Sequence, residues 1–184
     1  MIFLLLFAAL AGGASSAPLT KEAVRLLGAD RVNTHALEMI WNGKDTVFVD
    51  YPTKADDAGD LGLQLKAVQR SHGRLQQFAI TEEEPVGGDP AVAAIGFANA
   101  DRDPAKELIV ILEWPQKHYD YEGRLLEVRL FDDAKEGQAA LMPMKVSSNF
   151  GLGCECYYRD DRKPERYKFA TIASVKRELR RLGY

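Results

Sequence analysis

The chain has 184 residues and a formal net charge of −3, from 24 basic and 27 acidic side chains. This length is typical of one domain and is large enough to bury a core without help from a metal ion or a disulfide. The near-neutral balance argues against a nucleic-acid-binding protein, which usually carries a strongly basic face. With 46% apolar and 28% charged residues, the composition is that of a globular protein rather than a disordered one.

The first 17 residues have the composition of a secretory signal peptide. An apolar run from Met1 to Leu10 is followed by small residues up to Ala17, which is the pattern of a cleaved leader. The alternative is a buried N-terminal strand or helix. The run is too short for a bilayer, which takes about 20 apolar residues, and no later stretch is long and apolar enough for a membrane span. We expect an exported protein, periplasmic or secreted, with 1–17 as signal peptide and 18–184 as a single β-rich domain.

The remaining chain begins with a short predicted helix over 20–28, with Thr20 as its N-cap and Gly28 as its stop. The apolar period then changes to two, which predicts β-strands. Asn42 and Gly43 lie between two such runs and predict a hairpin, because both turn positions tolerate positive φ. The strands expected up to the middle of the chain are 37–41, 46–51, 63–69, 75–80 and 91–97, separated by an acidic loop over 52–62, a turn over 71–73 and an irregular loop over 81–90.

The second half of the chain continues the β pattern. The apolar runs 107–114 and 125–131 predict strands, whereas Pro143 interrupts the pattern of 138–147 and leaves it ambiguous. We expect a loop or ragged hairpin over 149–166. The predicted fold class is therefore mainly β, or α+β by strict count: about eight short antiparallel strands in one domain, with a short N-terminal helix and an amphipathic C-terminal helix.

The C-terminal helix is predicted over 171–182 from apolar residues at a spacing of three to four, with Thr171 as cap and Gly183 as stop. Its final turns carry a net charge of +3, from Lys176, Arg177, Arg180 and Arg181 against Glu178. Cations near a helix C-terminus are favoured by the helix dipole, so this face is expected to be solvated. The alternative is a surface that meets an anionic partner.

A loop between two apolar strands is rich in side-chain oxygens. Its positions 1, 3, 5 and 9 are Asn99, Asp101, Asp103 and Glu107. Oxygen donors in this spacing can wrap a hard cation as the backbone curls, and calcium takes about six to eight oxygens. At position 7 the ligand would be a backbone carbonyl, here that of Ala105. Calcium is therefore the candidate cofactor, with these five residues as its ligands. The alternative is a polar turn whose Asp and Asn side chains cap local backbone groups.

Residues 91–113 resemble the calcium loop of FG-GAP/VCBS-type repeats, whose pattern is Asp-x-Asp/Asn-x-Asp-Gly-x-x-Asp/Glu followed by an apolar strand. The resemblance implies the same four side-chain ligands. The chain departs from the pattern at Asn99, which replaces a charged ligand, and at Pro104, where the family usually has glycine. In that family the repeats build propellers, which need at least about four blades. The resemblance therefore implies a blade-like hairpin and not a propeller.

Cys154 and Cys156 are the only cysteines, and two cysteines in an exported protein usually pair. In an extended strand, Cα atoms two residues apart are separated by about 6.6–6.8 Å, at the edge of the disulfide range. A bond would need a tight turn, which Gly151 and Gly153 would permit. The open alternatives are an inert local bridge, two thiols on one face, and a redox-active pair.

His118 and Asp120 alternate with tyrosines, so they are expected to share one face of a strand, and an oriented His–Asp pair can act as a general base. The alternative is an ordinary surface hairpin in which the two residues have no chemical role. No nucleophile signature such as Gly-x-Ser-x-Gly accompanies them. The sequence therefore favours a non-enzymatic exported binding or interaction module, stabilised by calcium through the 99–107 loop, with a protein or surface ligand as its partner. The alternatives are a small secreted hydrolase, a thiol redox protein and an inhibitor of a secreted enzyme.

Overall fold

The computed structural model of the protein describes residues 18–29, 33–54, 59, 61–160 and 162–184. The expected signal peptide over 1–17 lies outside the described residues, as do Asp56, Asp57 and Asp60 of the expected acidic loop. Among the helices that the structure describes, none has the length and apolar character needed to cross a membrane.

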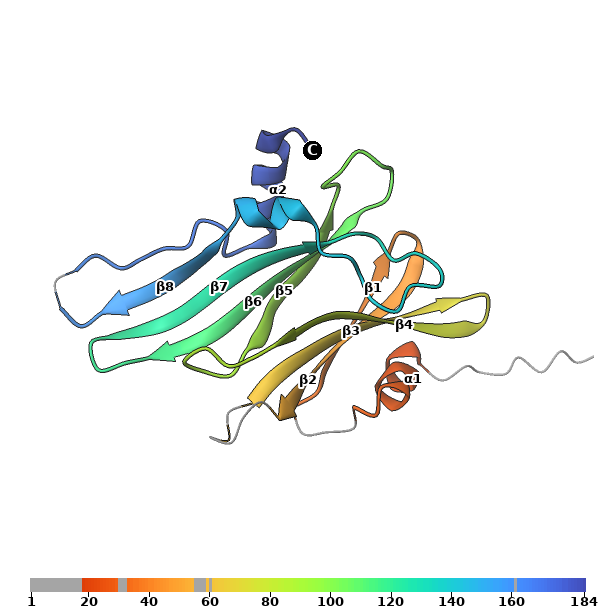
Figure 1. The fold of residues 1–184 in the computed structure, drawn as a ribbon, viewed down its shortest axis with the longest axis horizontal. Coiled ribbons are helices and arrows are strands. Elements are labelled where there is room, and N and C mark those ends of the chain that lie inside the picture. The colour runs from red at the N-terminus through yellow and green to blue at the C-terminus, as the bar shows by residue number, and fades with distance from the viewer. Residues whose placement is uncertain (1–17, 30–32, 55–58, 60, 161) are drawn as a thin grey trace, which may run out of the picture.

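Eight antiparallel strands form two four-stranded sheets, in which each strand pairs with its neighbours along the chain (Figure 1). The first sheet comprises β1 (His35–Trp41), β2 (Lys44–Lys54), β3 (Leu61–Ser71) and β4 (Arg74–Glu83). The second comprises β5 (Ala91–Ala98), β6 (Glu107–Lys117), β7 (Tyr121–Phe131) and β8 (Leu152–Tyr158). The other described elements are α1 (Leu19–Leu26), the 3-10 helix η1 (Lys145–Asn149) and α2 (Ile172–Leu182). The prediction of a mainly β fold with two helices is confirmed.

The two sheets pack face to face around a shared apolar core. On β6, Leu108, Val110 and Leu112 belong to this inter-sheet core, whereas Ile109 and Ile111 belong to a second core under α2. Successive side chains of a strand point to opposite faces. Because both faces of β6 are covered, it appears in the sequence as an uninterrupted apolar run rather than an alternating one.

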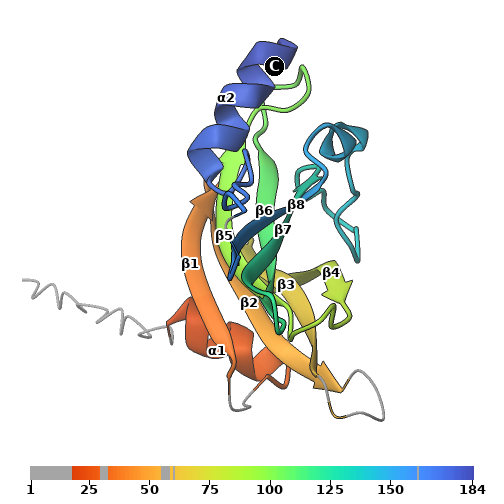
Figure 2. The ribbon, with the colours of Figure 1, turned by 90° about the vertical axis from the view of Figure 1, so that its left-hand side faces the viewer.

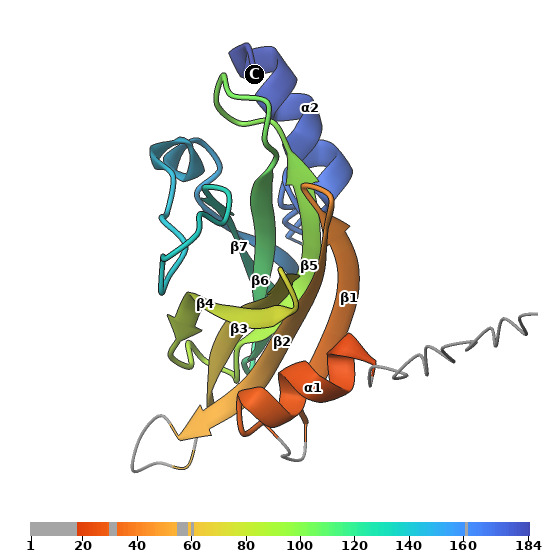
Figure 3. The ribbon, with the colours of Figure 1, turned by 90° about the vertical axis from the view of Figure 1, so that its right-hand side faces the viewer.

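Each helix covers the outer face of one sheet. Ala23 of α1 shares an apolar cluster with Val49 of β2, and Val175 and Leu179 of α2 share one with Ile109 of β6. Figure 1 shows α1 on one side of the paired sheets and α2 with η1 on the other. Figures 2 and 3 show α2 and α1 at opposite ends of the molecule.

Several expectations about local structure are wrong. The loops expected over 52–62 and 81–90 are shorter, because β2 continues to Lys54, β3 begins at Leu61 and β4 continues to Glu83.

The segment 149–166, expected as a loop or ragged hairpin, contains β8, because residues 152–158 pair with β7 over their whole length. This pairing is a tertiary contact that local composition does not reveal. The first helix is not capped by Thr20: Pro18 occupies the N-cap position without a side-chain hydrogen bond, and the Thr20 hydroxyl donates to Glu38 Oε2 at 2.7 Å instead.

The predicted ends of α2 are confirmed. Thr171 Oγ1 accepts a hydrogen bond from the backbone N–H of Ser174 at 3.2 Å, which satisfies one of the free donors of the first turn. Gly183 follows the helix in a left-handed conformation, with φ of 96°. This positive φ favours glycine and ends the helix at Leu182.

Glu178 of α2 binds two basic side chains, one from the same helix and one from the segment that precedes it. Its carboxylate accepts hydrogen bonds from Arg181 Nη2 at 2.6 Å and from Lys168 Nζ at 3.1 Å. The bond from Arg181 is the main cause that lowers the pKa of Glu178 to about 2, and Lys168 adds to the effect against the opposing influence of desolvation. Part of the basic charge of α2 is thus neutralised within the fold.

Replacing Glu178 by glutamine should lower the stability of the protein in a pH-dependent way. The pKa of this carboxyl is lower in the folded protein, about 2, than its ordinary value of 4.5. Its ionised form therefore stabilises the fold above pH 4.5, and this contribution is lost as the pH falls from 4.5 toward 2. Denaturant unfolding should show Glu178→Gln less stable than the parent at pH 7, with a smaller difference at pH 3. Equal differences at the two pH values would contradict this role.

Candidate metal centre

The loop between β5 and β6 brings three carboxylates together. Asp101 and Asp103 belong to the loop, and Glu107 is the first residue of β6. One carboxylate oxygen from each of the three lies within 4.8 Å of the other two. A single hard cation can bridge oxygens at such separations. Three of the five predicted ligands therefore form one group.

Two consecutive Asx turns shape this loop. Asp101 Oδ1 accepts the backbone N–H of Asp103 at 2.8 Å, and Asp103 Oδ1 accepts that of Ala105 at 2.8 Å. Asn99 Nδ2 donates to the carbonyl of Asp103 at 2.7 Å. These hydrogen bonds are the ones expected of a polar turn that caps its own backbone. They also curl the backbone around the carboxylates. Ligation by Asn99 and by the carbonyl of Ala105 stays a prediction.

Glu107 distinguishes the group from an ordinary polar turn. Its side chain has no exposed surface, and its Oε2 accepts a hydrogen bond from the backbone N–H of Ala100. Its Oε1 is buried and has no hydrogen-bond partner among the described residues. Burial, to which the negative charges of Asp101 and Asp103 add, raises the pKa of Glu107 to about 7. A buried carboxylate in such surroundings is stabilised by a cation.

The β1–β2 turn of the first sheet fixes the end of the loop. Trp41 Nε1 and Asn42 Nδ2 donate to the carbonyl of Lys106 at 2.6 Å and 3.0 Å. The backbone N–H of Lys106 donates to Asn42 Oδ1 at 2.9 Å. Trp41 also stacks on Phe97 of β5, with ring centroids 5.7 Å apart. Sequence analysis assigned Asn42 to the hairpin alone, because this contact spans 64 residues.

A further carboxylate lies close enough to the loop to interact with it electrostatically. Asp133 follows β7, and its buried Oδ1 has no hydrogen-bond partner among the described residues, although Lys135 Nζ lies 3.7 Å away. Burial raises the pKa of Asp133, and the nearby charges of Asp132 and Asp103 add to the rise. Sequence analysis missed this residue, and the one available signal was an acidic pair directly after an apolar strand.

The expected pairing of His118 with Asp120 is not formed. Both residues lie in the turn between β6 and β7 rather than on one strand face. The His118 ring stacks on Tyr121, with centroids 4.4 Å apart, and Asp120 Oδ2 lies 3.5 Å from the guanidinium of Arg162. The two residues thus have separate partners, and the His–Asp arrangement that could act as a general base is not formed.

A different His–Asp pair lies across β1 and β2. His35 Nδ1 lies 3.0 Å from Asp50 Oδ2, because the two residues face each other in the strand register. Burial is the largest cause that raises the pKa of Asp50, and the bond to His35 partly opposes it. His35 is hydrogen-bonded to no nucleophilic side chain in the part of the chain that the structure describes. The pair alone therefore provides no arrangement for nucleophilic catalysis.

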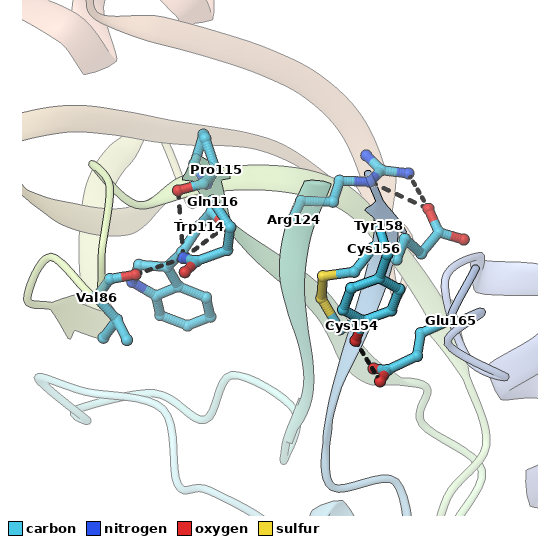
Figure 4. The surroundings of a disulfide bond; sticks show 10 residues. Val86, Trp114, Pro115, Gln116, Arg124, Cys154, Cys156, Tyr158 and Glu165 are labelled. Carbon is cyan, nitrogen blue, oxygen red and sulfur yellow. Dashed lines mark hydrogen bonds and ion pairs between the residues drawn. A yellow bond between two sulfur atoms is a disulfide. The ribbon is translucent and has the colours of Figure 1, made fainter. Parts of the chain in front are cut away.

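Cys154 and Cys156 form a disulfide within β8 (Figure 4). Their Cα atoms are 5.4 Å apart, inside the disulfide range, so the expected tight turn is not needed. Gly123 of β7 faces Cys156, and a Cβ at Gly123 would lie 2.1 Å from the carbonyl oxygen of Glu155. Glycine therefore permits the close approach of the bridged strand. The bond excludes the alternative of two free thiols.

No protein-family model, curated protein or solved structure matches the chain. Of the candidate groups described above, the carboxylates of the 99–107 loop have the most specific geometry.

Replacing Asn42 by glycine should destabilise the protein through loss of the bonds to Lys106. Asn42 has a φ of 49°, which glycine adopts without strain, so the turn itself is preserved. Loss of two hydrogen bonds should cost about 1–2 kcal/mol, measured by denaturant unfolding. His72→Gly is the matched control, because His72 has a φ of 50° in the β3–β4 turn. That variant should be neutral or more stable, and an equal loss in both variants would contradict the role of Asn42.

Replacing Glu107 by glutamine should stabilise the metal-free protein at high pH. The folded-state pKa of this carboxyl, about 7, lies above its ordinary value of 4.5. Ionisation of Glu107 is therefore less favourable in the folded protein than in the unfolded one, and it lowers the free energy of unfolding. This loss of stability begins above pH 4.5 and is complete above pH 7. The cost is on the order of 3 kcal/mol. Unfolding in a chelator should show Glu107→Gln more stable than the parent at pH 8 and similar to it at pH 4.5. A less stable variant at pH 8 would show that the charge is already compensated.

Proposed function

We propose that this protein is an exported, non-enzymatic binding or interaction module whose 99–107 loop is stabilised by a calcium ion. The observation that carries the calcium assignment is the Glu107 carboxylate, which is buried and close to two other carboxylates, and whose Oε1 has no hydrogen-bond partner in the part of the chain that the structure describes. Burying a charge in this way is unfavourable unless it is paired. A divalent cation supplies the missing partner.

The donor set favours calcium over softer metals. Asp101, Asp103 and Glu107 offer only oxygen atoms, which suit hard cations, whereas zinc and copper sites usually contain nitrogen or sulfur ligands. Asn99 and the carbonyl of Ala105 are the further predicted ligands, and water would complete the shell. Calcium accepts irregular oxygen cages, whereas magnesium demands a near-ideal octahedron. The resemblance to FG-GAP/VCBS-type loops supports the same assignment.

The proposed ion would strengthen one end of the sandwich. Glu107 begins β6, and the neighbouring Lys106 is bonded to the β1–β2 turn of the other sheet. A cation bound by Glu107 and the two aspartates would therefore hold the loop against β6 of the second sheet, next to its contacts with the first sheet. Exported modules of this kind commonly bind calcium at about 10⁻⁴–10⁻³ M.

Export and a binding role have separate support. The composition of residues 1–17 is that of a leader, and disulfides such as Cys154–Cys156 persist in oxidising compartments. β1 lies at the edge of its sheet and exposes Leu37 and Ile40, by 47% and 72%. These two side chains are three residues apart and lie on opposite faces of β1, so the binding role depends on the strand edge, whose backbone groups can pair with a strand of another protein.

Calcium should raise the unfolding temperature of the purified protein. At ten times its Kd, an ion that binds only the folded state stabilises it by about 1.4 kcal/mol, which is roughly 3–6 °C for a domain of this size. The measurement is thermal unfolding in a chelator and in several concentrations of calcium. Asp101→Asn and Glu107→Gln should abolish the shift, because each removes one carboxylate charge from the group.

Two controls make the result specific. Glu122→Gln removes an exposed carboxylate from β7, away from the loop, and should leave the calcium shift unchanged. Magnesium at the same concentration should not reproduce the shift. If calcium stabilises the parent and Glu107→Gln equally, or stabilises neither, the loop is a polar turn and the calcium proposal is wrong.

A further inference from the structure

A cavity of about 220 Å³ lies between α2 and the beginning of the 99–107 loop. Figures 2 and 3 show α2 beside this loop, with the C-terminal end of the helix next to the loop tip. The cavity is lined by the end of β5, by Asn99 and by side chains from the second half of α2. It is separate from the carboxylate group, although Asn99 borders both.

Two cations that line the cavity have no charged or hydrogen-bonded side-chain partner among the described residues. Lys176 and Arg180 are four residues apart on α2, so they lie on the same face of the helix. Neither makes an ion pair or a side-chain hydrogen bond with any residue that the structure describes. By contrast, Arg181 on the same helix is bonded to Glu178 at 2.6 Å. Two cations that converge on one cavity are suited to an anion with more than one charged oxygen.

Part of the cavity wall is apolar: Phe97 of β5 and Leu179 of α2 contribute to it, and Leu179 is almost fully buried. Tyr184, which follows α2, lines the cavity as well. Asn99 adds an amide at the rim. A ligand that fills this space therefore needs an anionic head for the two cations and a small apolar body for the wall.

Two backbone carbonyls near the end of α2 already accept hydrogen bonds from the backbone that follows the helix. The carbonyls of Leu179 and Arg180 accept hydrogen bonds from Tyr184 and Gly183 at 3.1 Å and 3.2 Å. Free carbonyls at a helix C-terminus carry a partial negative charge and attract lysine and arginine. Both carbonyls therefore have donors other than Lys176 and Arg180.

We propose that this cavity binds a phosphate group carried on a small apolar body, through Lys176 and Arg180. The guanidinium of Arg180 supplies several donors in a planar fork, and the ammonium of Lys176 supplies the second charge of a phosphate dianion. The same chemistry is found in a soluble organic phosphate and in the headgroup of an anionic phospholipid. The apolar wall then contacts the ring or chain next to the phosphate.

The test is calorimetric titration of the full chain with phenyl phosphate in the presence of a chelator. Parent, Lys176→Gln, Arg180→Gln and Arg177→Gln are compared. Arg177 is the matched control, because it is an exposed cation of the same helix that does not line the cavity. Phenyl phosphate should bind the parent, with affinity reduced about tenfold or more by Lys176→Gln or Arg180→Gln. Arg177→Gln should change the affinity less than about twofold.

Further ligands test the anionic and apolar parts of the cavity one at a time. They also distinguish a soluble organic phosphate from a phospholipid headgroup. Phenol and inorganic phosphate should each bind more weakly than phenyl phosphate, because each lacks one half of the ligand. Flotation with phosphatidate vesicles, compared with phosphatidylcholine vesicles, identifies a lipid source if the association requires Arg180. Phenyl phosphate binding without such flotation identifies a soluble source.

The proposal is overturned if phenyl phosphate does not bind the parent at millimolar concentration, or if Arg177→Gln and Arg180→Gln weaken binding equally. Thermal unfolding of each variant shows that a loss of binding is not a loss of fold. Since the titration is made in a chelator, its failure would leave the calcium assignment standing. A failed calcium shift would equally leave the result for this cavity unchanged.

Discussion

Both backbone groups of Lys106 are held by the β1–β2 turn of the opposite sheet, and the position of the candidate metal centre depends on this attachment. The next residue, Glu107, begins the most deeply buried strand of the fold. Because Lys106 is hydrogen-bonded to the other sheet and β6 is buried in the core, both the end of the loop and the strand that follows it are held in place. The carboxylates of Asp101 and Asp103 are therefore brought against Glu107 rather than left to move independently.

The position of Glu107 is unfavourable for stability, because an acidic side chain is buried at the start of an apolar strand. A strand as deeply buried as β6 would gain stability from an apolar residue at this position, yet the chain has an acid there. Such conflicts are expected where function opposes stability. The same argument applies less strongly to Asp133, whose buried oxygen has Lys135 nearby. The acidic group and the neighbouring cavity, with Lys176 and Arg180 in its lining, lie close together because Asn99 of the loop borders both.

The sequence predicted those features that depend on neighbours along the chain. A period of two predicted most of the strands, Asn42-Gly43 predicted the first hairpin, and Thr171 with Gly183 predicted the ends of α2. The spacing of oxygen donors predicted three carboxylates that lie together. Features that depend on distant segments could not be predicted: the bonds from Trp41 and Asn42 to Lys106, and the pairing of β8 with β7. In both cases the two partners are far apart in the sequence, and nothing in the local sequence of either one indicates the contact.

The plain meander order of both sheets has a consequence for how the protein folds. Each strand pairs only with its neighbours along the chain, so every pairing closes a comparatively short loop at a small cost in chain entropy. The first sheet and α1 come entirely from the N-terminal half of the chain, so their strand pairings do not require the C-terminal half. The bonds between Lys106 and the β1–β2 turn need both halves. The loop geometry around Glu107 is thus completed only when the two sheets dock, and it reports on the last stage of folding.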